Sequence, residues 1–349
     1  MEKFFKILLF FIPVAFFVNS YRFSPIVIFA FSALAIIPLA KFIGEATEEL
    51  TIYTGPAWGG FLNATFGNAT ELIIGIFALQ AGLIEVVKAS ITGSILGNLL
   101  FVLGSAIFFG GIKRKEQKFN ATAAKASGST LLLAIIALVI PAIFLQTSSI
   151  SSTGGVIEKL SVLVAIIMII AYFASLIFSL YTHKHLYTED VGKYEAKWSI
   201  KKSISILLIS TVAVAFMSEI LVGSIEPIVA SLGWTELFIG VIFVAIIGNA
   251  AEHTSAITMA VKNKMDLSLQ IAIGSATQIV MFVAPALVLI SLFFPTNMSL
   301  VFNTFELVAI IFSVFVVNAV IEDGESNWFE GVQLIMAYII IAVAFFFHP

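Results

Sequence analysis

Two glutamates, Glu71 and Glu252, each stand in the middle of a long apolar stretch of the chain. An ionisable side chain at that depth in a membrane-spanning helix is costly, so it usually faces a polar interior and marks a functional site. Both follow a Gly-Asn pair, Gly67-Asn68 and Gly248-Asn249. Glycine lowers helix propensity, which allows nearby carbonyl oxygens to leave the helical ladder. Carboxylate, amide and carbonyl oxygens together form the hard donor set that Ca²⁺ takes.

A proton and a divalent cation would compete for these two carboxylates. A carboxylate away from water holds a proton more readily, and a nearby divalent cation favours its ionised form. We therefore expect Glu71 and Glu252 to release protons as the cation binds and to regain them as it leaves. The alternative is that each glutamate is a protonated structural residue hydrogen-bonded to a neighbouring helix. We consider this less favoured, because two glutamates occur at equivalent positions in near-identical contexts. Because the chain has no Cys, Zn²⁺ and Cu⁺ are not the expected cargo.

The composition places these residues in a membrane protein. Of 349 residues, 60% are hydrophobic and 11% are charged, and the mean hydropathy is +1.08; a soluble domain has roughly a quarter of its residues charged. The apolar runs are continuous rather than alternating, which favours helices over a barrel. We predict an all-α integral membrane protein of about eleven transmembrane helices, near residues 4–20, 25–50, 58–83, 86–110, 124–146, 156–182, 200–231, 235–261, 266–293, 299–321 and 328–347.

The two glutamates belong to an internal repeat. A shift of 181 positions places residues 67–71 (GNATE) on 248–252 (GNAAE), and Gly93-Ser94 on Gly274-Ser275. Each repeat holds five predicted spans, an odd number, so the second repeat enters the membrane from the opposite side. Such inverted repeats are common in secondary transporters, which bind substrate between the repeats near the midplane. The predicted organisation is an extra N-terminal helix (1–22), a first repeat (23–182), a cytoplasmic linker (183–199) and a second repeat (200–349).

The basic residues predict the orientation. All but four of the 18 Lys and Arg residues fall on the side of the membrane where the N-terminus lies. The exceptions are Arg22, Lys41, Lys88 and Lys159. The positive-inside rule then puts the N-terminus in the cytoplasm and the C-terminus outside, in a multi-pass protein of the cytoplasmic (inner) membrane. The net charge of −3 argues against a nucleic-acid partner. With no phosphate-binding Gly-rich loop in the sequence, ATP-driven transport is not expected, and neither is a cofactor.

Further polar side chains could line the site. On the next helix of each repeat, Ser94 and Asn98 match or lie near Ser275 and Gln278. Such residues can bridge helices in a membrane, and a role in packing alone fits them equally well. A histidine, His253, directly follows the second glutamate and could relay protons, although adjacent residues of a helix point in different directions.

Five acidic residues of the second and seventh predicted spans form a second tier: Glu45, Glu48, Glu49, Glu219 and Glu226. Glu45 and Glu226 are equivalent in the repeat, so they should approach opposite faces of the membrane and attract cations to two vestibules. Glu48 and Glu49 are as readily explained as helix-end charges in water. Glu219 lies well inside its span and is expected to line the pathway.

The glutamate motifs also resemble those of a known family. Residues 60–72 (GFLNATFGNATEL) and 248–253 (GNAAEH) look like the paired signatures of the calcium/proton antiporter (CAX) branch of the calcium/cation antiporter superfamily, in its compact bacterial form. This resemblance covers almost the whole chain. It implies exchange of cytosolic Ca²⁺ for external H⁺ by alternating access, with Glu71 and Glu252 as the alternating cation and proton sites. It also suggests a homo-oligomer, specifically a trimer, and Asn68, Asn249, Ser94, Asn98, Ser275 and Gln278 as residues lining the site.

Three other functions fit less well. A Na⁺/Ca²⁺ exchanger shares the inverted repeat, but its signatures place a proline just before the glutamate, where this chain has Thr70 and Ala251. A cation channel gathers acidic rings from several subunits around an axial pore, whereas this chain is expected to build its site from two internal repeats. A membrane-embedded enzyme would need a nucleophile beside Glu252 and His253, and their own segment offers none. We therefore expect a transporter rather than an enzyme, with Ca²⁺, H⁺ and the lipid bilayer as its partners.

Overall fold

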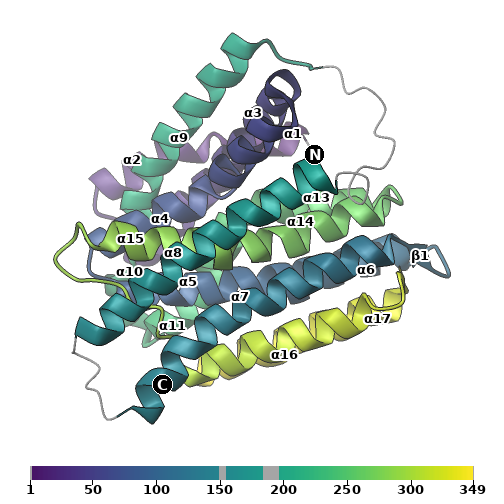
Figure 1. The fold of residues 1–349 in the computed structure, drawn as a ribbon. Coiled ribbons are helices and arrows are strands. Elements are labelled where there is room, and N and C mark those ends of the chain that lie inside the picture. Colours follow the sequence, from purple (N-terminus) through teal and green to yellow (C-terminus); the bar gives the residue numbers. More distant parts are fainter. Residues whose placement is uncertain (1, 149–154, 184–195, 349) are drawn as a thin grey trace.

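A computed structural model describes residues 2–148, 155–183 and 196–348. Long helices run side by side through the molecule (Figure 1). At one end the short strands β1 (Gln117–Lys118) and β2 (Glu325–Ser326) pair antiparallel; we call this the ribbon end. The C-terminus and helix α11 (Glu236–Phe238) lie at the opposite end, which we call the α11 end (Figure 1). Residues 184–195 of the predicted linker lie outside the described ranges.

The predicted membrane fold is confirmed in its class. Among the described residues, seven helices are long and apolar enough to span a membrane, or up to eight if the bent pair Glu236–Gly248 and Ala250–Val261 is one span. The total of eleven remains a prediction. Three shorter apolar helices coincide with further predicted spans: Phe5–Ser20, Ala69–Gln80 and Thr304–Val320.

The first half turns back on itself inside helix α3 (Pro25–Phe66). A Cβ atom on Gly59 would lie 2.9 Å from Cβ of Thr51, whereas eight residues of a straight helix rise about 12 Å. The chain therefore reverses between these residues, near the predicted boundary of two spans, although its helical hydrogen bonding is continuous. The other elements are α1 (Glu2–Leu8), α2 (Phe11–Ser20), α4 (Ala69–Gln80), α5 (Ile84–Leu96), η1 (Gly97–Val102), α6 (Leu103–Gly111), α7 (Ala121–Thr147), α8 (Gly155–Ile177) and η2 (Phe178–Thr182).

The second half begins at Ile200, where the predicted linker ends. Segments marked η are short π-helical stretches, which often occur at functional sites. Two of them, η1 and η5, interrupt equivalent helices of the two halves. The elements are α9 (Ile200–Gly223), α10 (Ile225–Leu232), η4 (Ile239–Val244), α12 (Ala245–Gly248), α13 (Ala250–Val261), α14 (Met265–Gln278), η5 (Ile279–Val283), α15 (Ala284–Ser291), α16 (Thr304–Val320) and α17 (Trp328–Phe347).

Burial separates central spans from peripheral ones. The most apolar stretch of Ile84–Gly111 is 89% buried, against 22% for Gly155–Thr182 and for Trp328–Phe347. Large apolar side chains such as Ile170 and Ile340 are exposed on these outer helices, as a surface facing lipid allows. The helix that carries Ser94 is thus at the centre of the fold.

Candidate cation and proton site

Each glutamate lies in the first turn of a helix that starts at a break. Helix α3 ends at Phe66 and α4 begins at Ala69, while α12 ends at Gly248 and α13 begins at Ala250. The second break bends the chain by 61°. Asn68 and Asn249 have non-helical backbones, with φ −108°, ψ 24° and φ −93°, ψ 14°, so the predicted interruption occurs in both halves. In the first turn, the helix dipole favours an ionised carboxylate by about 0.3–1 kcal/mol.

Glu71 lies against the break of the opposite repeat. A Cβ atom on Gly248 would be 3.1 Å from Cγ of Glu71, so this glycine leaves room for the glutamate. Among the described residues, neither carboxylate oxygen of Glu71 has a hydrogen-bond partner, nor does Oε2 of Glu252, and all three atoms are shielded from solvent. A charged carboxylate buried without donors costs several kcal/mol. These carboxylates are suited to holding a cation or a proton.

Amide and hydroxyl groups join the two halves beside the glutamates. Nδ2 of Asn98 donates to Oδ1 of Asn249 at 2.8 Å and to Oγ of Ser275 at 3.0 Å. Nδ2 of Asn249 donates in turn to Oγ of Ser94 at 2.8 Å. All three bonds run from one half of the chain to the other. The structure therefore brings these four predicted residues into one buried network.

Asn68 joins this region through a different partner. Its Nδ2 donates to Oε1 of Gln278, again across the two halves. Within the described part of the chain, Oδ1 of Asn68 and Oδ1 of Asn98 are buried and accept no hydrogen bond. Like the unpaired carboxylate oxygens, they are oxygens of the type that a hard divalent cation takes as ligands. In the described ranges, no three His, Asp or Glu side chains are placed so that they could hold a metal ion together, so a cation bound here would also need amide or backbone oxygens as ligands.

A cavity of about 400 Å³ reaches only one of the two glutamates. Glu252, Gly67 and Gln278 line it, and Met259 and Leu267, which flank the turn between α13 and α14, lie on its wall toward the ribbon end. Glu71 is not part of the lining. The site is therefore open toward the ribbon end, on the Glu252 side.

The equivalent helix face in the first half is closed. A Cβ atom on Gly93 would overlap the carbonyl oxygen of Val241 in η4, and one on Gly240 would overlap Cβ of Ala89. Gly274, the counterpart of Gly93, has no atom within 4 Å of such a Cβ and lines the cavity. The cavity residues Leu267, Gln270, Ile271 and Gly274 correspond at the repeat offset to Val86, Ala89, Ser90 and Gly93.

Glu48 and Glu49, at the end of the second predicted span, have different surroundings. Glu48 lines the cavity that leads to Glu252. Oε2 of Glu49 instead accepts hydrogen bonds from the backbone N–H groups of Lys197, at 2.8 Å, and Trp198, at 3.0 Å. Glu49 therefore anchors the segment that precedes α9, whereas Glu48 could attract cations toward the site.

The remaining acids lie away from the cavity. Glu45 forms an ion pair with Lys41 at 3.5 Å. Glu219 lines a separate cavity of about 460 Å³ that residues of α2, α3, α9 and α10 surround. Glu226 is exposed on α10. The structure does not bring these three carboxylates to the network around Asn249.

His253 is turned from the cavity. Its ring packs edge-on against Phe101 of η1, with ring centres 6.1 Å apart, and it does not line the cavity. Conversely, sequence reasoning missed Gln270 as a lining residue. The signal was available, because Gln270, Gly274 and Gln278 recur at the four-residue spacing of one helix face.

Comparison with known proteins agrees with this architecture. The family described as "Sodium/calcium exchanger protein" matches residues 24–181 and 202–347. The chain belongs to this family. Its two matched segments lie on either side of the segment that precedes α9, and each contains one of the breaks that carry Glu71 and Glu252.

Several proteins resemble the chain over nearly its full length. It is 47% identical over 366 residues to a Ca²⁺/H⁺ antiporter of Synechocystis, covering 100% of this chain and 98% of the relative. It is 50% identical over 326 residues to the Ca²⁺/H⁺ antiporter ChaA of Bacillus subtilis, covering 92% of each. The solved structure of YfkE matches with a TM-score of 0.87 and 45% identity, over 99% of this chain and 100% of that one.

Proposed function

We propose that the protein exchanges cytosolic Ca²⁺ for external H⁺ by alternating access, with Glu71 and Glu252 as the carboxylates that bind Ca²⁺ and protons in turn. The observation that carries this proposal is the pair of glutamates at the two repeat breaks: both carboxylate oxygens of Glu71 and Oε2 of Glu252 are shielded from solvent and have no hydrogen-bond partner among the described residues. Their oxygen-only surroundings suit Ca²⁺. The ions are those named for relatives at 47% and 50% identity.

The open cavity supports a direction of entry for the cation. Lys113, Lys115 and Lys262 are exposed near the ribbon end, and positive charge favours the cytoplasmic side. Ca²⁺ therefore enters from the cytoplasm past Glu48 and reaches Glu252 first. Closing α14 onto the segment before Gly67, and releasing α5 from η4, would expose the same carboxylates to the outside. Protons then replace the cation, because an unpaired buried carboxylate is favoured when neutral.

The test is Ca²⁺ uptake into proteoliposomes that hold the purified protein, driven by an imposed pH gradient or by an imposed Na⁺ gradient. Glu71→Gln and Glu252→Gln are compared with the parent, and Glu226→Gln is the matched control because that carboxylate is exposed on α10. We expect uptake with the pH gradient that both site variants lose and the control keeps. Uptake that follows Na⁺ would identify a Na⁺/Ca²⁺ exchanger instead. No Ca²⁺ flux under either gradient would refute the assigned cargo.

A further inference from the structure

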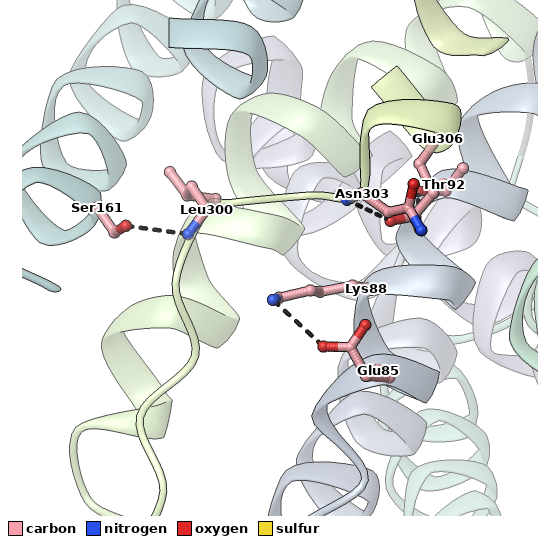
Figure 2. A network of polar contacts seen from close by, with 7 residues as sticks. All are labelled: Glu85, Lys88, Thr92, Ser161, Leu300, Asn303 and Glu306. Carbon is pink, nitrogen blue, oxygen red and sulfur yellow. Dashed lines mark hydrogen bonds and ion pairs between the residues drawn. The ribbon is translucent and has the colours of Figure 1, made fainter. Parts of the chain in front are cut away.

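A buried carboxylate outside the cation site binds the central helix α5. Glu306 is 1% exposed and is the third residue of α16. Its Oε1 accepts a hydrogen bond from Oγ1 of Thr92 at 2.8 Å, and its Oε2 accepts one from the backbone N–H of Asn303 at 2.9 Å (Figure 2). The carboxylate thus ties the start of α16 to the middle of α5.

Thr92 stands at the contact that closes the α11 end. It directly precedes Gly93, which packs against the backbone of Val241 in η4. It is two residues before Ser94, whose hydroxyl accepts from Asn249. Because α5 is one rigid helix at this point, a bond that fixes Thr92 also fixes Gly93 against η4 and the hydroxyl of Ser94 in the network.

The start of α16 is itself held in place. Oγ of Ser161 in α8 accepts a hydrogen bond from the backbone N–H of Leu300 at 3.0 Å, just before α16 (Figure 2). On α5, Lys88 forms an ion pair with Glu85 at 3.5 Å, one turn before Thr92 (Figure 2). A chain of polar contacts therefore runs from the peripheral helix α8 through the start of α16 to α5.

The second half cannot form the same tie. At the repeat offset, Thr92 corresponds to Ile273, which has no hydroxyl. Helix α7 packs on α14 and also starts at an asparagine N-cap, Asn120, but its third residue is Ala123 rather than a glutamate. Helix α14 is bonded to the start of α7 through the partly exposed Asp266, near its own start, where Oδ1 accepts from the backbone N–H of Asn120 at 2.7 Å. The asymmetry among the described residues is therefore that a buried carboxylate holds the middle of α5, and Ile273 offers no such bond in the middle of α14.

We propose that Glu306 is a positioning residue that acts through Thr92. It holds α5 against η4 and thereby favours the arrangement that is closed at the α11 end and open at the ribbon end. This inference rests on the proposed alternating access and adds a built-in preference to it. Weakening the bond should release α5 and increase the population that is open at the α11 end.

Cysteine labelling tests the preference directly, because the chain has no native Cys. Ser90→Cys reports the α5–η4 contact, since Ser90 N would lie 3.2 Å from a Cβ on Gly240. Ile271→Cys, its repeat counterpart, reports the open cavity. Both are labelled in vesicles with a membrane-impermeant maleimide that is present on both sides of the membrane. In the parent background we expect slow labelling at position 90 and fast labelling at position 271.

Thr92→Val removes the hydroxyl at nearly constant volume, and Thr92→Ser keeps it. We expect Thr92→Val to raise the labelling rate at position 90 several-fold and to lower that at position 271, with Thr92→Ser like the parent. Unchanged rates in Thr92→Val would overturn the proposal, as would the same change in Thr92→Ser. Should Thr92→Val fail to fold, Thr92→Ala is measured instead; it also removes the hydroxyl that donates to Glu306 and should shift both rates in the same direction, and no shift would overturn the proposal.

Transport in the same vesicles separates this role from simple loss of stability. Thr92→Val should raise the KM for Ca²⁺ supplied at the ribbon end several-fold, because fewer molecules are open there, and Thr92→Ser should restore it. An unchanged KM with a lower maximal rate would contradict a positioning role. The labelling readout needs no ion flux. If the parent moves no Ca²⁺, the proposed function fails while the labelling still decides the role of Glu306.

Discussion

The two Gly-Asn breaks have nearly the same sequence but different surroundings. The side chain of Asn249 donates to Ser94 and to the carbonyl oxygen of Ala245, and accepts from Asn98. Asn68 donates to Gln278, and its Oδ1 accepts nothing among the described residues. The repeat therefore provides matching donors and acceptors, and the packing of the surrounding helices decides which of them are already occupied.

The helices that follow the breaks show the same contrast on a larger scale. The α5 face around Gly93 is packed on η4, and the α14 face around Gly274 lines a cavity. Where equivalent residues are identical, as with these glycines, the difference is one of conformation and can reverse. Where they differ, as with Thr92 and Ile273, the difference is fixed in the chain. Each of the following variants tests one side of this comparison.

The largest effect should come from the carboxylates themselves. Although the cavity reaches only Glu252, we expect Glu71→Gln to be as damaging as Glu252→Gln, because both would bind one cation between the repeats. Loss of a carboxylate ligand should weaken Ca²⁺ binding by on the order of 100-fold or more, beyond the 10–100-fold usual for outer-shell partners. Calorimetric titration of Ca²⁺ measures this. A substantial affinity left in Glu71→Gln alone would show that the two glutamates do not share a site.

Replacing the equivalent glycines, Gly93 and Gly274, should have different effects. In Gly93→Ala the new methyl group would overlap the carbonyl of Val241, so we expect a protein several degrees less stable to heat, since overpacking costs about 1–3 kcal/mol. Gly274→Ala has free space in this structure and should keep its stability and its Ca²⁺ binding. It should nevertheless slow exchange roughly 10-fold, if α14 must pack closely in the other state and that packing is disturbed by about 1.4 kcal/mol. Thermal unfolding and uptake rates, measured on both variants, check this pair. A normal exchange rate in Gly274→Ala would contradict the inference that α14 packs closely in the other state.

The loss of Ca²⁺ affinity on replacing Asn98 or Asn68 should follow the number of hydrogen bonds that each amide makes. Asn98→Ala removes the donor to both Asn249 and Ser275, whereas Asn68→Ala removes one bond to Gln278. We expect a loss of Ca²⁺ affinity within the range of about 10–100-fold for Asn98→Ala and a smaller one for Asn68→Ala. Titration of Ca²⁺ into both variants gives the order. Asn68→Ala as the weaker binder would mean that its unpaired Oδ1 outweighs the network.

The smallest effect should be electrostatic. Glu48→Gln removes a charge from the cavity wall and should raise the KM for Ca²⁺ a few-fold at low ionic strength, with the difference shrinking as salt screens it. Glu49→Gln is the matched control, because that side chain is bonded to the backbone of Lys197 and Trp198. Uptake at several salt concentrations measures both. An equal change in the two variants would argue against attraction through the cavity.

The sequence predicted the class of fold, and it singled out all four residues of the buried network as candidates, because both inferences depend on local pattern. Long apolar runs indicate spans, and a glutamate repeated at one offset indicates a shared site. It could not predict that Glu49 binds a distant backbone or that His253 packs on Phe101, because both depend on which way a side chain turns after the helices pack. The open side was equally hidden, since Gly93 and Gly274 are the same residue in matching contexts. The oligomer expected from the family remains a prediction.

The π-helical stretches have a consequence for the tolerance of the chain to insertions and deletions. Segment η1 begins at Gly97, between Ser94 and the apolar end of its span, and η5 begins one residue after Gln278. One residue of an α-helix corresponds to a rotation of about 100°. Deleting one residue after Asn98 within η1 could restore regular helix while turning all of α6 about its axis, away from its close contact with α17 at Gly104 and Gly331. Length in these two spans is therefore constrained residue by residue, even where the side chains are interchangeable.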